Sequence, residues 1–309
     1  MHDDSGLNHR HGRTTSKALL LALGITLSFA FFELVGGLLS GSLALVSDAG
    51  HMFTDVVALS LSVWASYIVL RPPNERQTFG YLRVEILIAM VNGLVLAATS
   101  FIIMYEAIQR IQSPVGIEAP LMLLVAVIGL AANIAGILIL REKAEENLNV
   151  KGAAMHIFGD MLSSIGVIVG AVLIYLFDLT IADPVISIII SLVILYSAYK
   201  VIKQATYVLL EFAPGGVDRV KVREEMRKVP GVQEVEDIHV WTLGSGIYAM
   251  SAHVLVADKP VSACSCIIKE CEEMLRARFN ISHSTLQLEY EACEGEVCPL
   301  VKPRENDRF

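Results

Sequence analysis

Residues 43–70 read LALVSDAGHMFTDVVALSLSVWASYIVL, an apolar run that contains three ionisable side chains, those of Asp48, His51 and Asp55. At about 1.5 Å per residue, about 20 apolar residues in a helix cross the roughly 30 Å hydrocarbon core of a bilayer. Carboxylate and imidazole groups are costly inside hydrocarbon and usually mark functional positions there. The stretch therefore predicts a membrane-spanning helix with a functional site.

Five further apolar runs of similar length surround this one. The six runs are Ala18–Leu39, Leu43–Leu70, Val84–Ile108, Pro120–Leu140, Val150–Phe177 and Ile181–Leu209. The chain of 309 residues is 54% hydrophobic and only 18% charged, whereas soluble domains are about 25% charged. We therefore predict an α-helical membrane domain of six spans over residues 18–210, after a tail of residues 1–17. The composition excludes a soluble enzyme, a disordered chain and a disulfide-rich secreted domain.

The positive charges predict the orientation of the spans. Most lie on one side, in the N-terminal tail, the second–third loop, the fourth–fifth loop and the end of the sixth span: Arg10, Arg13, Lys17, Arg71, Arg76, Arg83, Arg141, Lys143, Lys151, Lys200 and Lys203. The loops on the other side hold only Arg110. The positive-inside rule then places both termini in the cytoplasm. The net charge of −8 argues against binding to nucleic acid.

Composition changes after Pro214-Gly215-Gly216, which we interpret as a hinge. Residues 217–309 are polar and predict a cytoplasmic domain. Helices are expected at about Asp218–Lys228 and Val261–Phe279, and strands at about Val235–Leu243, Ile247–Val256 and Thr285–Glu291. The order αββαβ predicts a small ferredoxin-like α+β domain. All five cysteines lie here, where a reducing cytoplasm favours metal ligation or packing over disulfides.

A seven-residue motif occurs twice within the predicted spans. Residues 49–55 read AGHMFTD and residues 154–160 read AMHIFGD, so both fit A-x-H-x-F-x-D. The motifs contain His51 and His156, the two histidines of the predicted spans, with Asp55 and Asp160 four residues further on. Residues i and i+4 lie on one helix face. Both aspartates are expected near the bilayer midplane, about 18 Å and about 15 Å from the points of entry.

Two such helices that face each other would offer two imidazoles and two carboxylates, a complete tetrahedral set for Zn²⁺. One H-x-x-x-D motif is weak evidence, but two at matched depth favour a metal or proton site. Asp48 is open to two interpretations, a lining of the exit path or a helix cap. We expect Glu33, Asn92 and Asn133 to form hydrogen bonds between helices and Gly36-Gly37 to allow close packing.

With these spans and motifs, the chain resembles the cation diffusion facilitators, in particular their zinc-transporting branch. Further matching stretches are ELVGG at 33–37, GSLALVSD at 41–48, FGYLRVE at 79–85, HVW at 239–241 and LQLE at 286–289. The resemblance implies that His51, Asp55, His156 and Asp160 bind the transported ion. It also implies a homodimer that exports Zn²⁺ from the cytoplasm in exchange for H⁺ by alternating access.

Two loops depart from patterns of that family. The second–third loop, Arg71 to Arg83, lacks the histidines of a second metal site, so we assign none there. The fourth–fifth loop, Arg141 to Asn149, lacks the His-rich insertion of many eukaryotic relatives, which favours a bacterial inner-membrane protein.

The C-terminal domain offers candidate regulatory metal ligands. His239 and His253 are expected to be near neighbours across the hairpin, where His283 or Glu289 would complete a site. Cys293 and Cys298 form a second candidate, together with His9 and His11 of the N-terminal tail. The alternative to metal ligation is core packing for Cys264 and Cys271 and a solvated tail for Cys293 and Cys298. Cys264 and Cys266 diverge if their segment is helical.

Two other functions compete with proton-coupled export. A metal-dependent intramembrane hydrolase needs an open ligand position for water, which two histidines and two aspartates do not leave. The sequence also has no H-E-x-x-H, Walker A or G-x-S-x-G motif, so we do not expect an enzyme. A metal-sensing receptor with a cytoplasmic output domain is the third hypothesis.

Overall fold

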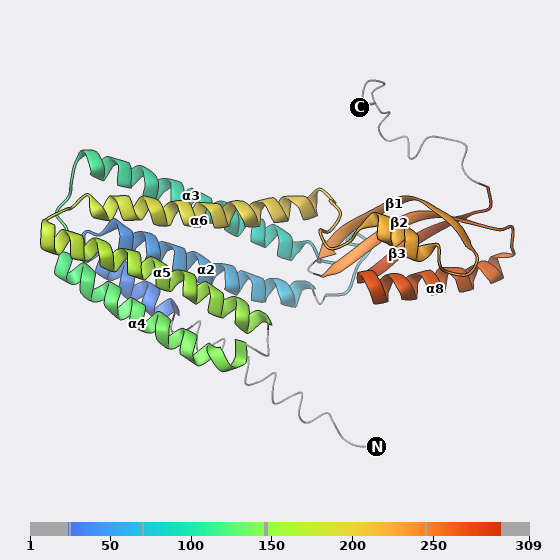
Figure 1. Cartoon of the computed structure of the whole chain (residues 1–309), viewed down its shortest axis with the longest axis horizontal. Coiled ribbons are helices and arrows are strands. Elements are labelled where there is room, and N and C mark those ends of the chain that lie inside the picture. The colour runs from blue at the N-terminus through green and yellow to red at the C-terminus, as the bar shows by residue number, and fades with distance from the viewer. Residues whose placement is uncertain (1–23, 25, 70, 145–147, 245, 292–309) are drawn as a thin grey trace, which may run out of the picture. The chain divides into compact units, whose positions relative to one another are not determined.

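The computed structural model describes residues 24, 26–69, 71–144, 148–244 and 246–291 (Figure 1). The chain groups into two compact units. The first contains the residues up to Trp64 and Ala89–Ile202, and the second contains Ala65–Ile88 and the residues from Lys203 onward. The end of α2, the start of α3 and the end of α6 therefore belong to the same unit as the polar C-terminal segment. This grouping does not separate the chain at the predicted hinge.

Long helices follow the predicted apolar runs closely. They are the helix Thr26–Ser40, α2 (Leu43–Val69), α3 (Val84–Gln112), α4 (Ala119–Ala144), α5 (Leu148–Phe177) and α6 (Ala182–Leu209). Four of them have segments that are long and apolar enough to cross a membrane: Val84–Gln112, Ala119–Leu138, Ile157–Phe177 and Ala182–Leu209. The number of six spans, which adds α2 and the helix Thr26–Ser40, stays a prediction.

Small residues let the helices approach closely, as expected for a membrane bundle. A Cβ atom on Gly36 would lie 2.5 Å from a methyl carbon of Val125 in α4. A Cβ atom on Gly37 would lie 3.0 Å from the backbone nitrogen of Val46 in α2. The predicted role of Gly36-Gly37 in close packing is therefore confirmed.

The C-terminal elements occur in the predicted order. They are α7 (Arg219–Met226), β1 (Val232–Gly244), β2 (Ile247–Val256), α8 (Val261–Phe279) and β3 (Ile281–Glu289). The sheet has the order β1-β2-β3, with β1 antiparallel and β3 parallel to β2. Asp218 caps α7 as predicted, since its side chain accepts a hydrogen bond from the Val220 N–H at 2.9 Å. The ferredoxin-like assignment stays a prediction.

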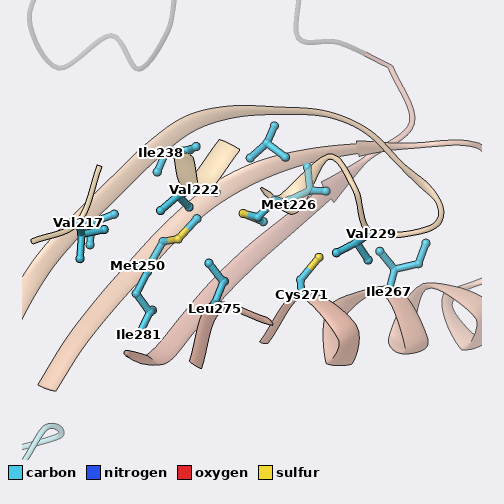
Figure 2. Close-up of a cluster of buried hydrophobic side chains, with 14 of the residues drawn as sticks. Val217, Val222, Met226, Val229, Ile238, Met250, Ile267, Cys271, Leu275 and Ile281 are labelled. Carbon is cyan, nitrogen blue, oxygen red and sulfur yellow. The ribbon is translucent and has the colours of Figure 1, made fainter. Parts of the chain in front are cut away.

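The core of this domain lies between the sheet and its two helices (Figure 2). Val222 and Met226 of α7 and Cys271 and Leu275 of α8 are fully buried against the sheet. Along β2 the alternate residues Met250, Ala252, Val254 and Val256 are buried, while Ser251, His253 and Leu255 are half-buried. The opposite face of the sheet, which we call the open face, therefore carries polar and titratable side chains.

Candidate metal-transport site

The first H-x-x-x-D motif lies in the middle of α2. His51 Nε2 is 3.4 Å from Asp55 Oδ2, and both side chains are about one-fifth exposed. The helical spacing thus puts the imidazole and the carboxylate on one face, as the sequence predicts. One oxygen and one nitrogen donor of the types that Zn²⁺ prefers are adjacent here.

Contact between α2 and α5 occurs beside both motifs. Ser163 Oγ of α5 donates a hydrogen bond to Asp48 Oδ1 of α2 at 2.6 Å. The side chains of Asp48 and Asp160 are almost completely buried, with 1% and 3% of their surface exposed. The two helices that carry the motifs therefore lie against each other (Figure 1).

This hydrogen bond fixes the register of the two helices. The two helices α2 and α5 run in opposite directions (Figure 1). His51 follows Asp48 by three residues, and Asp160 precedes Ser163 by three residues. His51 is consequently level with Asp160, and four residues further inward Asp55 is level with His156 in α5. This backbone register is compatible with the prediction that all four ligands lie at a similar depth in the helix pair.

The described side chains do not themselves complete a metal site. Among them, no three His, Cys, Asp or Glu side chains form a group that could hold a metal ion. The side chain of His156 lies outside the described part of the structure. The proposed four-ligand set is therefore argued from register and residue type.

Neighbouring polar residues clarify two of the open interpretations. Asp48 lies inside α2, which begins at Leu43, so it does not cap a helix end. Asn133 Nδ2 of α4 donates to Ser164 Oγ of α5 at 3.3 Å, which confirms it as a hydrogen bonder between helices. Glu33 is 1% exposed, and within the described part of the chain its Oε2 atom has no hydrogen-bond partner. Asn92 is half-buried, and its expected interhelical bond stays a prediction.

One residue that positions the motif of α2 escaped the sequence analysis. Asp183, at the start of α6, is fully buried and accepts hydrogen bonds from Ser42 Oγ at 2.5 Å and from the Leu43 and Ala44 N–H groups at 2.8 and 3.1 Å. A carboxylate at this position satisfies unpaired amides and complements the helix dipole. Arg110 of α3 lies 4.0 Å from Asp183 and donates to the Gly41 carbonyl at 2.6 Å. This cluster anchors the start of α2 to α6 and α3.

The candidate ligands of the cytoplasmic domain divide into two pairs. His253 Nδ1 is 2.9 Å from Glu289 Oε1, and His239 Nε2 is 2.9 Å from Asp237 Oδ1. The strand register places His239 opposite Ser251, two residues from His253. A register shift between Glu236 and His239, with Asp237 at φ +48°, offsets the hairpin there. The two histidines are therefore diagonal neighbours on the open face of the sheet.

His283 is placed elsewhere. Its ring packs edge-on against Phe79 of the α2–α3 loop, with ring centroids 5.6 Å apart. The structure thus associates Glu289, and not His283, with His253.

Among the described cysteines, Cys264, Cys266 and Cys271 are free thiols. Cys271 is buried in the core and Cys264 packs at its edge, which confirms their interpretation as packing residues. Burial raises the pKa of the Cys271 thiol to about 11, so it stays protonated at neutral pH. Cys266 is exposed, so it diverges from Cys264 as predicted. Cys293, Cys298, His9 and His11 lie outside the described residues.

Apolar helices of span length, a paired His/Asp motif within them and a polar αββαβ domain define a membrane protein that handles metal cations. Residues 19–210 match the family model of the cation efflux transmembrane domain. Residues 214–291 match the family model of the cation efflux protein cytoplasmic domain. The chain belongs to the cation efflux family, the cation diffusion facilitators.

Similar proteins cover nearly the whole chain. The zinc transporter ZitB of Escherichia coli is 40% identical over 302 residues, which are 94% of this chain and 96% of that protein. The metal cation efflux system protein CzcD of Cupriavidus metallidurans is 39% identical over 290 residues, 94% and 92% of the two chains. The cadmium, cobalt and zinc/H(+)-K(+) antiporter of Bacillus subtilis is 36% identical over 302 residues, 97% and 96% of the chains. These relatives are named as transporters and efflux proteins, not as enzymes.

Proposed function

We propose that the protein is a secondary transporter that exports Zn²⁺ from the cytoplasm in exchange for H⁺. The observation that supports this proposal is the Ser163–Asp48 hydrogen bond, because in antiparallel helices it is compatible with His51 at the level of Asp160 and Asp55 at the level of His156. Two imidazoles and two carboxylates suit Zn²⁺ in ligand type and number. The names of the relatives, which include zinc transporters and an antiporter, support the same substrate and the same mode of transport.

Proton exchange follows from the chemistry of the ligands. A metal ion binds neutral imidazole and ionised carboxylate, so metal binding displaces protons and metal release allows them to return. Histidine has an ordinary pKa of about 6.5 and therefore changes its charge within the physiological range. Alternating access requires that the four ligands face one side of the membrane at a time, and a midplane site meets this need.

The proposal includes a topology and an assembly. Six spans follow from the apolar runs. The distribution of Lys and Arg places both termini and residues 217–309 in the cytoplasm. The bilayer contact is supported by large apolar side chains that are more than 60% exposed on several helices, such as Leu38, Ile102 and Val193. We further propose that the protein is a homodimer. We also propose that it lies in a bacterial inner membrane, since the similar proteins are bacterial.

The cytoplasmic domain supplies a regulatory site in this proposal. Zn²⁺ bound by His253, Glu289 and His239 would favour one conformation of the transporter, which requires unequal affinity for the two conformations. The 2.9 Å contact between His253 and Glu289 on the open face of the sheet supports this assignment. The tail cysteines Cys293 and Cys298 stay a second candidate.

The transport site is tested by changing one ligand in reconstituted full-length protein. We expect Asp160→Asn to reduce zinc uptake by sealed vesicles at least about tenfold, because it removes one ligand and one negative charge. Asp55→Ala should have an effect of the same size. Uptake is measured with an internal zinc indicator, and proton movement with a pH indicator in the same vesicles.

A matched control removes a carboxylate elsewhere in the same compact unit. Glu106 in α3 is partly exposed and pairs with Arg110 at 3.2 Å, so Glu106→Gln should insert and transport like the parent protein. Wild-type zinc uptake by correctly inserted Asp160→Asn protein would contradict the assigned site. Zinc uptake without opposite proton movement would contradict the exchange mechanism and leave the metal ligands standing.

A further inference from the structure

The second compact unit contains a pocket of about 990 Å³ that the transport mechanism does not use. Its walls come from four parts of that unit: the α2–α3 loop, the segment that follows α6, the start of α7 and the open face of the sheet. Small-molecule sites in proteins have volumes of roughly 300–1,000 Å³. The pocket is therefore large enough for a phosphorylated ligand with an apolar part.

Three arginines line this pocket: Arg76, Arg83 and Arg219. Arg83 is bonded to Glu211 at 2.6 Å. In the described part of the chain, Arg76 and Arg219 have no carboxylate within 4.0 Å. The other acidic side chain of the wall, Asp237, is 2.9 Å from His239. The guanidinium groups of Arg76 and Arg219 are therefore available to bind an anion. The planar guanidinium group can form two parallel hydrogen bonds to phosphate oxygens.

The same walls expose aromatic surface next to the arginines. Phe79 is 48% exposed and Phe212 is 51% exposed, and Trp241 of β1 is half-buried beside them in the lining. Exposed aromatic rings beside cationic groups match an amphiphile better than a fully polar anion.

The wall continues directly from the end of α6. Lys203 lies 5.5 Å above the ring of Tyr207, and Tyr207 stacks on Phe212 with ring centroids 4.7 Å apart. Lysine and tyrosine at the end of a span mark the level of the lipid headgroups. Because Phe212 belongs to both the stack and the pocket, the pocket lies next to the end of α6.

We propose that this pocket binds the phosphate group of an anionic phospholipid headgroup, with Arg76 and Arg219 as the phosphate ligands. Arg83 adds positive charge while it holds Glu211, and the aromatic surface contacts the glycerol and acyl part. This lipid site is separate from the metal ligands of α2 and α5. Anionic lipid would thus be a ligand of the second compact unit, which contains the ends of three helices and the cytoplasmic domain.

Full-length protein in neutral detergent tests the proposal through its own fluorescence. The chain has two tryptophans, so a Trp64→Phe background leaves Trp241, which lines the pocket, as the reporter. Dioctanoyl phosphatidylglycerol should change the emission saturably, and dioctanoyl phosphatidylcholine should not. Arg76→Gln together with Arg219→Gln should weaken the phosphatidylglycerol response at least about tenfold. Higher salt should weaken the response of the parent protein as well.

The control variant is Arg276→Gln on α8, which removes an exposed arginine outside the pocket and should leave the response unchanged. Thermal unfolding of each variant reports whether it is folded. Inorganic phosphate distinguishes the source of the anion, because equal or tighter binding of phosphate alone would replace the lipid by a soluble ligand. A folded double variant that binds like Arg276→Gln, or an equal response to phosphatidylcholine, would overturn the proposal.

Discussion

At the scale of single residues, the proposed ligand set of α2 and α5 would determine which metal the transporter binds. His51 contributes an imidazole nitrogen 3.4 Å from the Asp55 carboxylate, so the two donors of α2 differ in charge and hardness. A metal with intermediate preferences, such as Zn²⁺, suits this mixture. The transport site is therefore expected to respond to a change in donor type as well as to the loss of a donor.

His51→Asp should keep zinc transport but widen selectivity toward Cd²⁺. The change keeps a ligand at the same place on α2, but it replaces the imidazole nitrogen that favours Zn²⁺ by a third carboxylate, which makes the site more charged and less discriminating. Competition between Zn²⁺ and Cd²⁺ in the vesicle assay measures the effect as a ratio of uptake rates. An unchanged ratio would mean that selectivity depends on other residues.

The sequence alone leads to the prediction of His51, Asp55, His156 and Asp160, because ionisable groups are costly in apolar runs and usually mark functional positions there. It was not sufficient to predict the role of Asp183. That residue lies near the start of an apolar run, and its three donors are provided by Ser42, Leu43 and Ala44, which are distant in the sequence. Only the packing of α6 against the start of α2 brings them together.

Asp183→Asn should lower the midpoint of thermal unfolding in detergent. The amide keeps one acceptor, but the remaining buried donors lose a charged partner, which typically costs about 1–3 kcal/mol. The matched control is Asp178→Asn, since Asp178 is exposed at the end of α5 and asparagine tolerates its φ of +54°. Equal midpoints for the two variants would contradict the anchoring role of Asp183.

At the scale of elements, the helix and strand order followed from periodicity and turn residues. The pairing of the hairpin about residue 245 did as well, since His239 lies opposite Ser251 and diagonal to His253. The sequence did not predict the one-residue shift in the pairing between Glu236 and His239, where Asp237 adopts a left-handed conformation. A bulge depends on local backbone geometry, and the alternation of apolar residues in a strand carries only a weak signal for it.

The two faces of α8 should differ in thiol reactivity. In a background with Cys293→Ser and Cys298→Ser, a maleimide should label exposed Cys266 rapidly at neutral pH. Cys271 should stay unlabelled until the protein unfolds, because it is buried and its raised pKa of about 11 keeps it protonated. Mass spectrometry of the labelled peptides measures this. Rapid labelling of Cys271 in the folded protein would contradict its place in the core.

At the scale of the whole molecule, the sequence predicts a membrane domain and a cytoplasmic domain that meet at Pro214-Gly215-Gly216. The structure adds contacts between distant parts of the chain, which local sequence patterns do not predict. A Cβ atom on Gly244 at the end of β1 would lie 3.2 Å from Leu82 Cβ, and Arg83 bonds to Glu211 after α6. Loop and sheet thus form one unit with the ends of α2, α3 and α6. A ligand on the open face of the sheet would therefore bind the same compact unit that contains these helix ends.

The double change His239→Ala and His253→Ala should raise the zinc concentration for half-maximal transport and leave the maximal rate mostly intact. Both histidines lie on the open face of the sheet, and the ligands of α2 and α5 are untouched. A regulatory metal shifts a conformational equilibrium only by the difference between its affinities for the two states. Zinc uptake at graded external concentrations measures the shift in the vesicle assay.

His283→Ala provides the matched control, because it removes a histidine of the same domain that packs against Phe79 and not beside Glu289. It should leave the half-maximal concentration unchanged. Zinc binding at equilibrium, measured in an Asp160→Asn background, separates the regulatory site from the transport site. A double variant that binds as much zinc there as its parent, or transports with the same half-maximal concentration, would remove the regulatory site from the proposal. The transport site would stand, since it depends on the register of α2 and α5 alone.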